Sequence, residues 1–131
     1  TQTSHPAKFH VEGEVYCNVC HSRNLINELS ERMAGAQVQL DCKDDSKKVI
    51  YSIGGETGQD GVYRLPVVGY HEDCEIKLVK SSRPDCSEIP KLAKGTIQTS
   101  KVDLSKNTTI TEKTRHVKPL SFRAKTDAPG C

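Results

Sequence analysis

Five consecutive residues near the start of the chain have types and a spacing that could do chemistry. The run Cys17-Asn18-Val19-Cys20-His21 matches Cys-x-x-Cys-His, the signature of covalent haem attachment. The Cys-x-x-Cys part alone also occurs in thioredoxin-like redox sites and in zinc sites. Four chemistries are therefore open to the cysteines: haem attachment, thiol exchange, zinc binding and structural disulfides.

Three of these four chemistries lack support elsewhere in the sequence. A haem needs an axial partner for His21, for which Met33, His71 and His116 are candidates, and a large apolar pocket that a chain with 5% aromatic residues and no Trp is poorly suited to supply. A redox motif belongs to parallel βαβ units, and zinc lacks a second Cys-x-x-Cys or a His-x-His pair. Structural disulfides are therefore favoured, and we expect no cofactor and no metal.

Length and composition indicate one small domain. The chain has 131 residues, 34% of them hydrophobic, and six Cys. We expect a single domain over residues 1–131 with a lean core that the cysteines reinforce. The longest apolar runs are three or four residues, too short to span a membrane. The 19 Lys and Arg and 17 Asp and Glu residues are mixed along the chain, which excludes a strong field for nucleic acid or anionic lipid.

The start of the chain and one sequon indicate an extracellular protein. Thr1-Gln2-Thr3 lacks both an initiator Met and an apolar leader, which we interpret as a mature chain after signal-peptide removal. Six cysteines point to the same oxidising compartment. The sequon Asn107-Thr108-Thr109 would accept an N-glycan there.

A period of two dominates the elements that must position these residues. Alternation along Phe9–Cys17, Ala36–Cys42 and Cys74–Lys80 turns Cys17, Cys42 and Cys74 toward the interior. Further strands are predicted at Val49–Ile53, at Val62–Val67, from about Gly95 to Lys106 and around Ile110. Seven short strands predict an all-β fold, an antiparallel Greek-key sandwich or barrel. Because Cys42 and Cys74 both point inward, they could join one sheet to the other.

Two segments have a helical pattern. Arg23–Met33 carries Leu25, Ile26, Leu29 and Met33 at spacings of three and four, and Gly35 could end this helix. A second helical turn is predicted at Ser87-Glu88-Ile89, ended by Pro90. Within the strand from Gly95 to Lys106 the apolar phase changes after Ile97, which predicts a bulge or bend.

Other polar and aromatic groups are weaker candidates for chemistry. No Gly-x-Ser-x-Gly elbow is present, so catalysis finds little support. The basic residues near the C-terminus are interpreted as a solvated face, the acidic groups as turn residues, and the tyrosines as packing residues more than as a sugar-stacking surface. The basic residues are Lys113, Arg115, His116, Lys118, Arg123 and Lys125. The acidic groups are His71, Glu72, Asp73 and Glu75, and the pair Glu56 and Asp60. The tyrosines are Tyr16, Tyr51, Tyr63 and Tyr70.

Several motifs together resemble the olive-pollen major allergen family. They include Gly13-Glu14-Val15-Tyr16-Cys17 with Cys20, Glu28-Leu29-Ser30, Gly35-Ala36, Cys42-Lys43-Asp44, Cys74-Glu75-Ile76, Asp85-Cys86 with Glu88-Ile89-Pro90, and Asn107 before Cys131. The resemblance covers nearly the whole chain and all six Cys. The chain departs from the usual signature at Asn18 and His21, where many members have Asp and Arg. The run Ala34–Leu40 followed by Asp60–Tyr63 is also similar to transthyretin-like sandwich domains.

This resemblance implies the disulfides Cys17–Cys86, Cys20–Cys131 and Cys42–Cys74 and a glycan on Asn107. It also implies a secreted, extracellular pollen glycoprotein bound by IgE antibodies, with a part in pollen hydration, germination or tube growth. We therefore expect a non-enzymatic recognition module for an extracellular protein or cell-wall glycan, with the charged loops Lys43–Lys48 and Ser81–Asp85 as contact surfaces. A small-ligand carrier with a barrel cavity is the alternative, and a hydrolase a weaker one.

Overall fold

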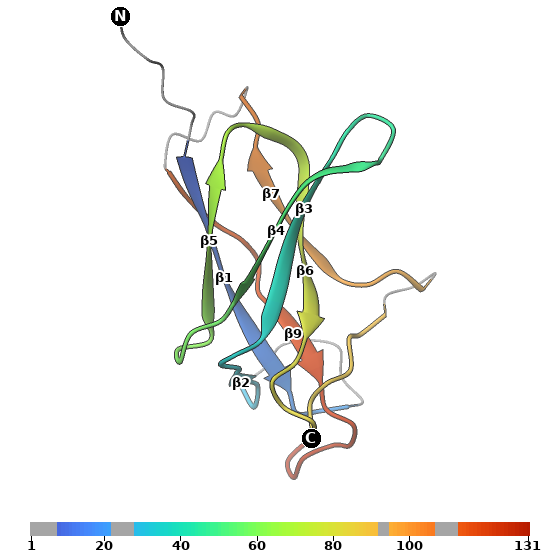
Figure 1. Cartoon of the computed structure of the whole chain (residues 1–131). Helices are drawn as coiled ribbons and strands as arrows, with labels where there is room; N and C mark the ends of the chain where they lie inside the picture. Colours follow the sequence, from blue (N-terminus) through green and yellow to red (C-terminus); the bar gives the residue numbers. More distant parts are fainter. Residues whose placement is uncertain (1–7, 22–27, 92–94, 107–112) are drawn as a thin grey trace, which may run out of the picture.

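The computed structural model describes residues 8–21, 28–91, 95–106 and 113–131, which form two β-sheets (Figure 1). Nine strands lie in these ranges: β1 (Lys8–Asn18), β2 (Glu31–Arg32), β3 (Gln37–Lys43), β4 (Val49–Glu56), β5 (Val62–Val68), β6 (His71–Lys80), β7 (Thr99–Leu104), β8 (Thr114–His116) and β9 (Leu120–Arg123). The all-β class is confirmed.

The first sheet is built around the long strand β1, which has neighbours along both edges. β5 and β2 pair with it antiparallel, whereas β8 and β9 pair with it parallel. The expectation of purely antiparallel pairing is therefore wrong for this sheet. β8 and β9 follow β7 of the other sheet, so the chain reaches β1 by a crossover and not by a hairpin, and a crossover allows a parallel partner.

The second sheet has the order β4-β3-β6-β7, and all its pairs are antiparallel. β3 and β4 form a hairpin. The chain then crosses to the first sheet as β5 and returns as β6, which lies beside β3 (Figure 1). Strands that are distant in sequence thus become neighbours, and this sets the partners of the cysteines.

The core lies between the two sheets and is filled by side chains. The predicted inward residues of β1, β3 and β6 are buried, as period two requires for sheets covered on one face. The largest fully buried side chains include Tyr63, Phe122, Met33, Leu40, Leu65, Ile76, Leu104 and Leu120. Most of this volume comes from aliphatic residues, in keeping with the low aromatic content.

Neither predicted helix appears in the described residues. Residues 28 and 29 form a turn, and Glu31–Arg32 is strand β2. The N–H of Met33 donates to the carbonyl of Val15 (2.9 Å), and the Thr57 hydroxyl donates to the Met33 carbonyl (2.6 Å). Because these tertiary partners take the backbone groups that a helix would use, they override the spacing. Residues 22–27 of the predicted helix lie outside the described ranges.

The second helical turn is also wrong, and one predicted strand is shorter than expected. Glu88 forms an isolated bridge with Arg123. The predicted strand from Gly95 to Lys106 begins only at Thr99, since Ile97 bridges to Lys91 instead. The predicted strand around Ile110 lies outside the described residues. No helix of the described ranges has the length and apolar character needed to cross a membrane.

Candidate functional site

The Cys-x-x-Cys-His run lies where β1 ends, and both of its cysteines are in disulfides. Cys17 is joined to Cys86 (Cα–Cα 6.0 Å), and Cys20 is joined to Cys131 (Cα–Cα 5.5 Å). Among the described residues no cysteine is free. The run therefore fastens the end of β1 to the loop before Glu88 and to the C-terminal residue.

The third disulfide joins Cys42 on β3 to Cys74 on β6. The two residues are directly opposed, with a Cα–Cα distance of 4.0 Å. Both are buried, as their alternation predicted, but the bond links adjacent strands of one sheet. The expectation of a bond between the sheets is wrong because a period of two fixes the face of a residue and not its neighbouring strand. The three bonds are the ones that the family resemblance implies.

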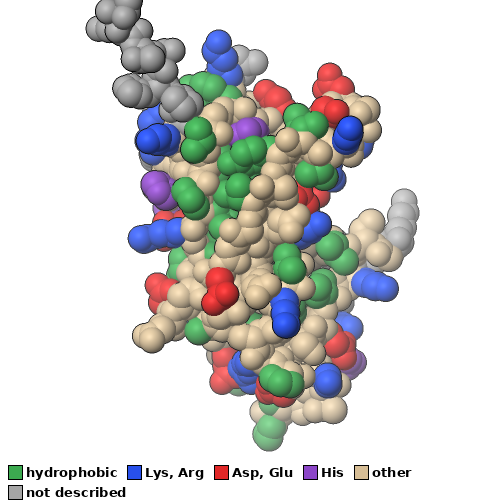
Figure 2. Space-filling view, in the orientation of Figure 1, with side chains coloured by type: hydrophobic (Ala, Val, Ile, Leu, Met, Phe, Trp, Pro, Cys, Tyr) green, Lys and Arg blue, Asp and Glu red, His purple; other side chains and the backbone are tan. Residues whose placement is uncertain are grey.

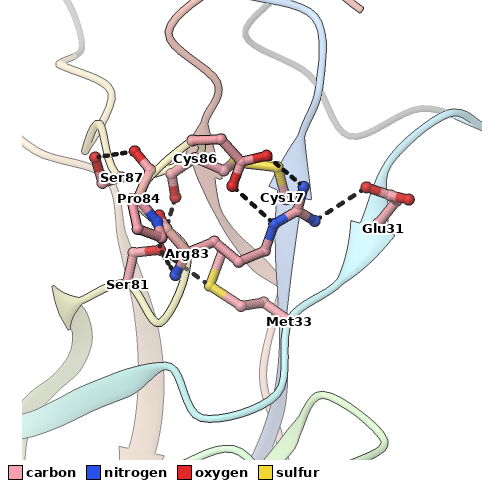
Figure 3. Close-up of polar contacts among 9 residues, drawn as sticks. Cys17, Glu31, Met33, Ser81, Arg83, Pro84, Cys86 and Ser87 are labelled. Carbon is pink, nitrogen blue, oxygen red and sulfur yellow. Dashed lines mark hydrogen bonds and ion pairs between the residues drawn. A yellow bond between two sulfur atoms is a disulfide. The ribbon is translucent and has the colours of Figure 1, made fainter.

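Near the first of these disulfides, Arg83 organises a cluster of charged side chains (Figure 3). Its Nη2 and Nε donate to the Asp85 carboxylate at 2.8 and 3.2 Å, and its Nη1 donates to Glu31 at 3.0 Å. The hydroxyl oxygen of Ser81 accepts the N–H of Arg83 (3.0 Å) and lies 2.7 Å from the Cys86 carbonyl oxygen. The loop from Ser81 to Cys86 is thus fixed by its own polar groups and by a disulfide.

The electrostatics of this cluster follow from the bidentate pair. Hydrogen bonds to Asp85 and then to Glu31 raise the pKa of Arg83, and the hydrogen bond from Arg83 holds the pKa of Asp85 below its usual value. The Arg83 side chain is about one-third exposed, so solvent still reaches it although its Nε, Nη1 and Nη2 all donate to carboxylates. The cluster presents fixed charges of both signs, which suits recognition of another surface.

An open depression of about 380 Å³ lies beside the Arg83 cluster. Its lining includes Glu31, Arg83 and Asp85 on one side, and Ala124, Thr126, Asp127, Ala128 and Pro129 of the C-terminal segment. The C-terminal segment that forms one wall is held by the Cys20–Cys131 bond and by a hydrogen bond from the N–H of Ala128 to the Val19 carbonyl (2.9 Å). Both disulfides at this end of the molecule therefore shape one polar surface.

The predicted basic segment does not form a single patch. Arg115 is buried; its Nε donates to the Asp103 carbonyl (3.1 Å), and its guanidinium lies 4.8 Å from the centre of the Phe9 ring. Arg123 pairs with Glu88 at 3.3 Å. Two of the six basic side chains are therefore structural. Figure 2 shows acidic and basic side chains interspersed over the face in view, with no large area of one sign.

The predicted acidic groups are engaged separately from one another. Glu75 pairs with Lys43 (3.1 Å), Asp73 pairs with Lys47 (3.2 Å), and Asp60 accepts the N–H of Val62 in its turn (3.1 Å). Within the described residues no three His, Cys, Asp or Glu side chains lie close enough together to hold a metal ion.

Three of the four tyrosines, Tyr51, Tyr63 and Tyr70, occupy different environments. Tyr63 is fully buried in the core, as the packing interpretation predicted. Tyr51 stacks on His71, with ring centres 3.9 Å apart, and Tyr70 is half exposed with its ring edge-on to Phe9. These tyrosines do not form one continuous sugar-stacking surface, since Tyr63 faces the interior.

Two further surface hollows have volumes of about 340 and 310 Å³. The first is lined by residues of β3 and β4 with Val79, and the second by His10, Glu12, Arg64 and Thr114. Both are open depressions outside the filled core, so they do not provide the enclosed barrel cavity that a small-ligand carrier needs.

Sequence reasoning placed Arg83 in a charged loop but missed its partner Glu31, because Glu31 fell inside the predicted helix. It also missed β9, although Leu120, Phe122 and Ala124 alternate and are buried. The alternation of apolar residues that predicts a strand is present in β9, but this segment was interpreted from its basic residues as a solvated face. The predicted glycan site Asn107 lies outside the described residues.

The fold and this surface define a class of protein: a two-sheet β domain fastened by three disulfides, with ion-paired loops at one end. The chain belongs to the family described as "Pollen protein Ole e 1 like", which matches residues 7–131.

Three similarities illustrate this membership. The chain is 99% identical to "Major pollen allergen Pla l 1" of Plantago lanceolata over 131 residues, which is 100% of both chains. It is 42% identical to an "Olee1-like protein" of Betula pendula, covering 95% of this chain and 76% of the relative. The "Crystal Structure of the Major Plantain Pollen Allergen Pla l 1" matches with a TM-score of 0.93 at 99% identity, covering 95% of this chain and 100% of that one. Neither the family description nor these names state an enzymatic activity.

Proposed function

We propose that this chain is a secreted pollen glycoprotein, bound by IgE as an allergen, that acts as a non-enzymatic extracellular recognition module in pollen hydration, germination or tube growth. The observation that carries the proposal is the disulfide-fastened, ion-paired surface around Arg83. A rigid surface loses little conformational entropy on binding, which favours recognition.

Secretion is supported by the cysteines. Three disulfides persist in oxidising compartments and are rare in the cytosol. A glycan on Asn107 fits the same compartment. We further propose that residues 1–131 form one domain, since the family match spans residues 7–131 without interruption.

Allergenicity is supported by the relative named "Major pollen allergen Pla l 1", which differs from this chain by about one residue in a hundred. Antibodies bind folded surface, and nearly all of that surface would be shared. IgE from plantain-sensitised donors is therefore expected to bind this chain.

A non-enzymatic role is supported by the state of the charged groups. The carboxylates of Glu75, Asp73 and Asp85 are each engaged by a cation, and burial without a described partner raises the pKa of the Tyr63 hydroxyl. None of these groups is placed as a nucleophile with an adjacent base. The partner we expect is an extracellular protein or a cell-wall glycan.

The experiment that tests the proposal is capture from pollen and stigma extracts with the folded, immobilised chain. The control is the same chain reduced and alkylated, which has the same composition and no fixed surface. We expect a saturable partner on the folded form only, displaced by soluble folded chain. Recovery of the same material on both forms contradicts recognition by the folded surface, as would a hydrolytic activity that copurifies with the chain through every column. Donor IgE is measured on the same two forms.

A further inference from the structure

The hollow of about 340 Å³ lies on the outer face of the four-stranded sheet, at a point where β4 has no side chain. Because side chains alternate along a strand, three residue pairs of β3 and β4 share this face: Asp41 with Ser52, Gln39 with Gly54, and Gln37 with Glu56. The register does not shift between these pairs. A Cβ on Gly54 would meet only the Val38 carbonyl oxygen, at 3.6 Å, so no neighbouring side chain fills the gap at this glycine.

On one side of the gap the polar side chains are held by one another. Nε2 of Gln39 donates to the Asp41 carboxylate (2.7 Å) and to the Ser52 hydroxyl oxygen (3.0 Å), and Lys77 pairs with Asp41 (3.1 Å). Both hydrogens of the Gln39 amide are therefore engaged, and its orientation is fixed. The amide oxygen of Gln39 accepts no hydrogen bond from the residues that the structure describes, so it is available to a ligand.

On the other side of the gap the polar side chains are unengaged. Gln37 and Glu56 are both exposed, and within the described ranges neither side chain forms a hydrogen bond or an ion pair. Val79 supplies an apolar wall. It is the extra residue of β6 at the register shift beside Gln37, and it is 46% exposed. The hollow thus combines an amide, an amide oxygen, a carboxylate and an aliphatic side chain.

These groups select one class of ligand. The acceptors outnumber the donors, so the ligand must bring several donors of its own. The charge of Glu56 repels an anion, while a single exposed carboxylate holds a cation only weakly. An apolar ligand would cover the amides without replacing their hydrogen bonds to water. A neutral ring with several hydroxyls supplies donors and acceptors together, and its C–H groups can pack against Val79.

We propose that the hollow over Gly54 binds a neutral sugar residue of an extracellular glycan. This inference rests on the proposed function, because it assigns a place on the fold to the cell-wall glycan named there. A protein partner at the Arg83 surface does not depend on it. The hollow is open and has no aromatic side chain in its lining, so we expect weak binding, with a dissociation constant on the order of 1 mM for a single sugar unit.

The test is an NMR titration of the intact, disulfide-bonded, ¹⁵N-labelled chain with three neutral disaccharides: cellobiose, lactose and xylobiose. Digalacturonate, which carries two carboxylates, is the charged counterpart. We expect saturable shifts of the backbone amide signals of Gln39, Gly54 and Val79 with at least one neutral disaccharide. Digalacturonate should bind more weakly because Glu56 repels it.

Gly54→Val blocks the hollow without disturbing the strand. The backbone at Gly54 is not left-handed, a branched side chain suits a strand, and the new methyl groups would occupy the gap. This variant should weaken disaccharide binding by about tenfold or more. Thr99→Val is the matched control, because it places the same side chain on β7 of the same sheet, outside the hollow, and should leave binding unchanged. Urea unfolding checks that both variants are folded.

Glu56→Gln tests the selection by charge. The amide keeps the hydrogen-bonding capacity and removes the repulsion, so binding of the neutral disaccharide should stay within about twofold while that of digalacturonate improves by roughly threefold. Loss with Gly54→Val, together with this pattern, supports the sugar site.

The absence of a saturable shift with all three neutral disaccharides overturns the site. Shifts confined to another surface, binding that survives Gly54→Val, or equal loss with Thr99→Val would also overturn it. These outcomes differ from a failure of the proposed function. A blank titration leaves capture of a protein by the Arg83 surface unaffected, and a saturable titration stands even when no partner is captured from an extract.

Discussion

Tyr63 packs its ring directly against Gly13, its partner on the neighbouring strand β1. A Cβ on Gly13 would lie 2.7 Å from Cζ of Tyr63 and 2.9 Å from Cγ2 of Val117. Tyr63 is fully buried, and so is Gly13. The glycine is therefore required by space, since only a residue without a side chain lets the tyrosine ring occupy this part of the core.

Gly13→Ala should destabilise the protein by about 1–3 kcal/mol, because the added methyl group overpacks a filled core. The matched control is Gly54→Ala, also within a strand, where the nearest heavy atom to the new Cβ is the Val38 carbonyl oxygen at 3.6 Å. That control should change stability by less than about 0.5 kcal/mol. Urea unfolding with intact disulfides measures both, and equal effects would contradict the role of Tyr63.

Tyr63→Phe should leave stability unchanged or raise it by up to about 1 kcal/mol. The buried Tyr63 hydroxyl has no hydrogen-bond partner among the described residues, so its removal relieves an uncompensated desolvation. Tyr63→Leu is the control, because loss of the ring should cost about 1–3 kcal/mol. Thermal unfolding of the two variants compares them. A clear loss of stability in Tyr63→Phe would instead reveal a partner for the hydroxyl.

The sequence predicted the parts of the fold that one strand can specify alone. Alternation in β1, β3 and β6 fixed the inward faces, because each strand is covered on one side only. It also predicted that Tyr63 packs in the core. Which strands are neighbours depends on crossovers, and for that reason the Cys42–Cys74 bond was placed between sheets when it lies within one.

The predictions that failed share a physical cause, which is that tertiary contacts outweighed the preference indicated by the local sequence pattern. Residues 31–32 add to β1 as a strand, since Val15 and Thr57 bind the backbone of Met33. The Arg83 cluster could not be foreseen because Glu31 and Asp85 are far apart in sequence and meet only in the fold. The sequence did predict the charged loop from Ser81 to Asp85, which contributes Arg83 and Asp85 to that cluster.

Asp41→Asn should flatten the dependence of stability on pH in acid. Asp41 is buried, and this burial raises its pKa, but hydrogen bonds from Gln39 and Ser52 and the ion pair with Lys77 (3.1 Å) outweigh it and lower the pKa overall. A carboxylate whose folded pKa lies below its unfolded value stabilises the fold at pH above the unfolded value, about 4. That stabilisation disappears as the pH falls through the folded pKa.

Unfolding free energies of wild type and Asp41→Asn at pH 7 and at successive values below pH 4 measure this contribution. The variant should be less stable at pH 7 and converge on wild type in acid. Asp45→Asn is the control, because Asp45 is an exposed residue of the nearby turn. Its substitution should change the unfolding free energy by the same amount at pH 7 and below pH 4. A constant gap between wild type and Asp41→Asn at every pH would rule out the titration of Asp41 as the cause.

Limited reduction should open the Cys20–Cys131 bond before the other two. Cys131 is exposed, whereas Cys17, Cys86, Cys42 and Cys74 are all buried. Exchange requires the attacking thiolate to reach a sulfur, so access sets the order. Brief treatment with a thiol, alkylation, and peptide mapping by mass spectrometry identify the first bond to open and test all three pairings in the untreated chain.

The same experiment separates the roles of the bonds. Loss of Cys20–Cys131 alone should release the wall of the depression near Asp127 while leaving the two sheets intact. Of the three disulfides, only this one holds the C-terminal segment. Far-ultraviolet circular dichroism should therefore change little at that stage, and a protease should cleave the C-terminal segment faster. Early opening of Cys42–Cys74, or a collapse of the β-sheet signal with the first bond, would contradict this assignment.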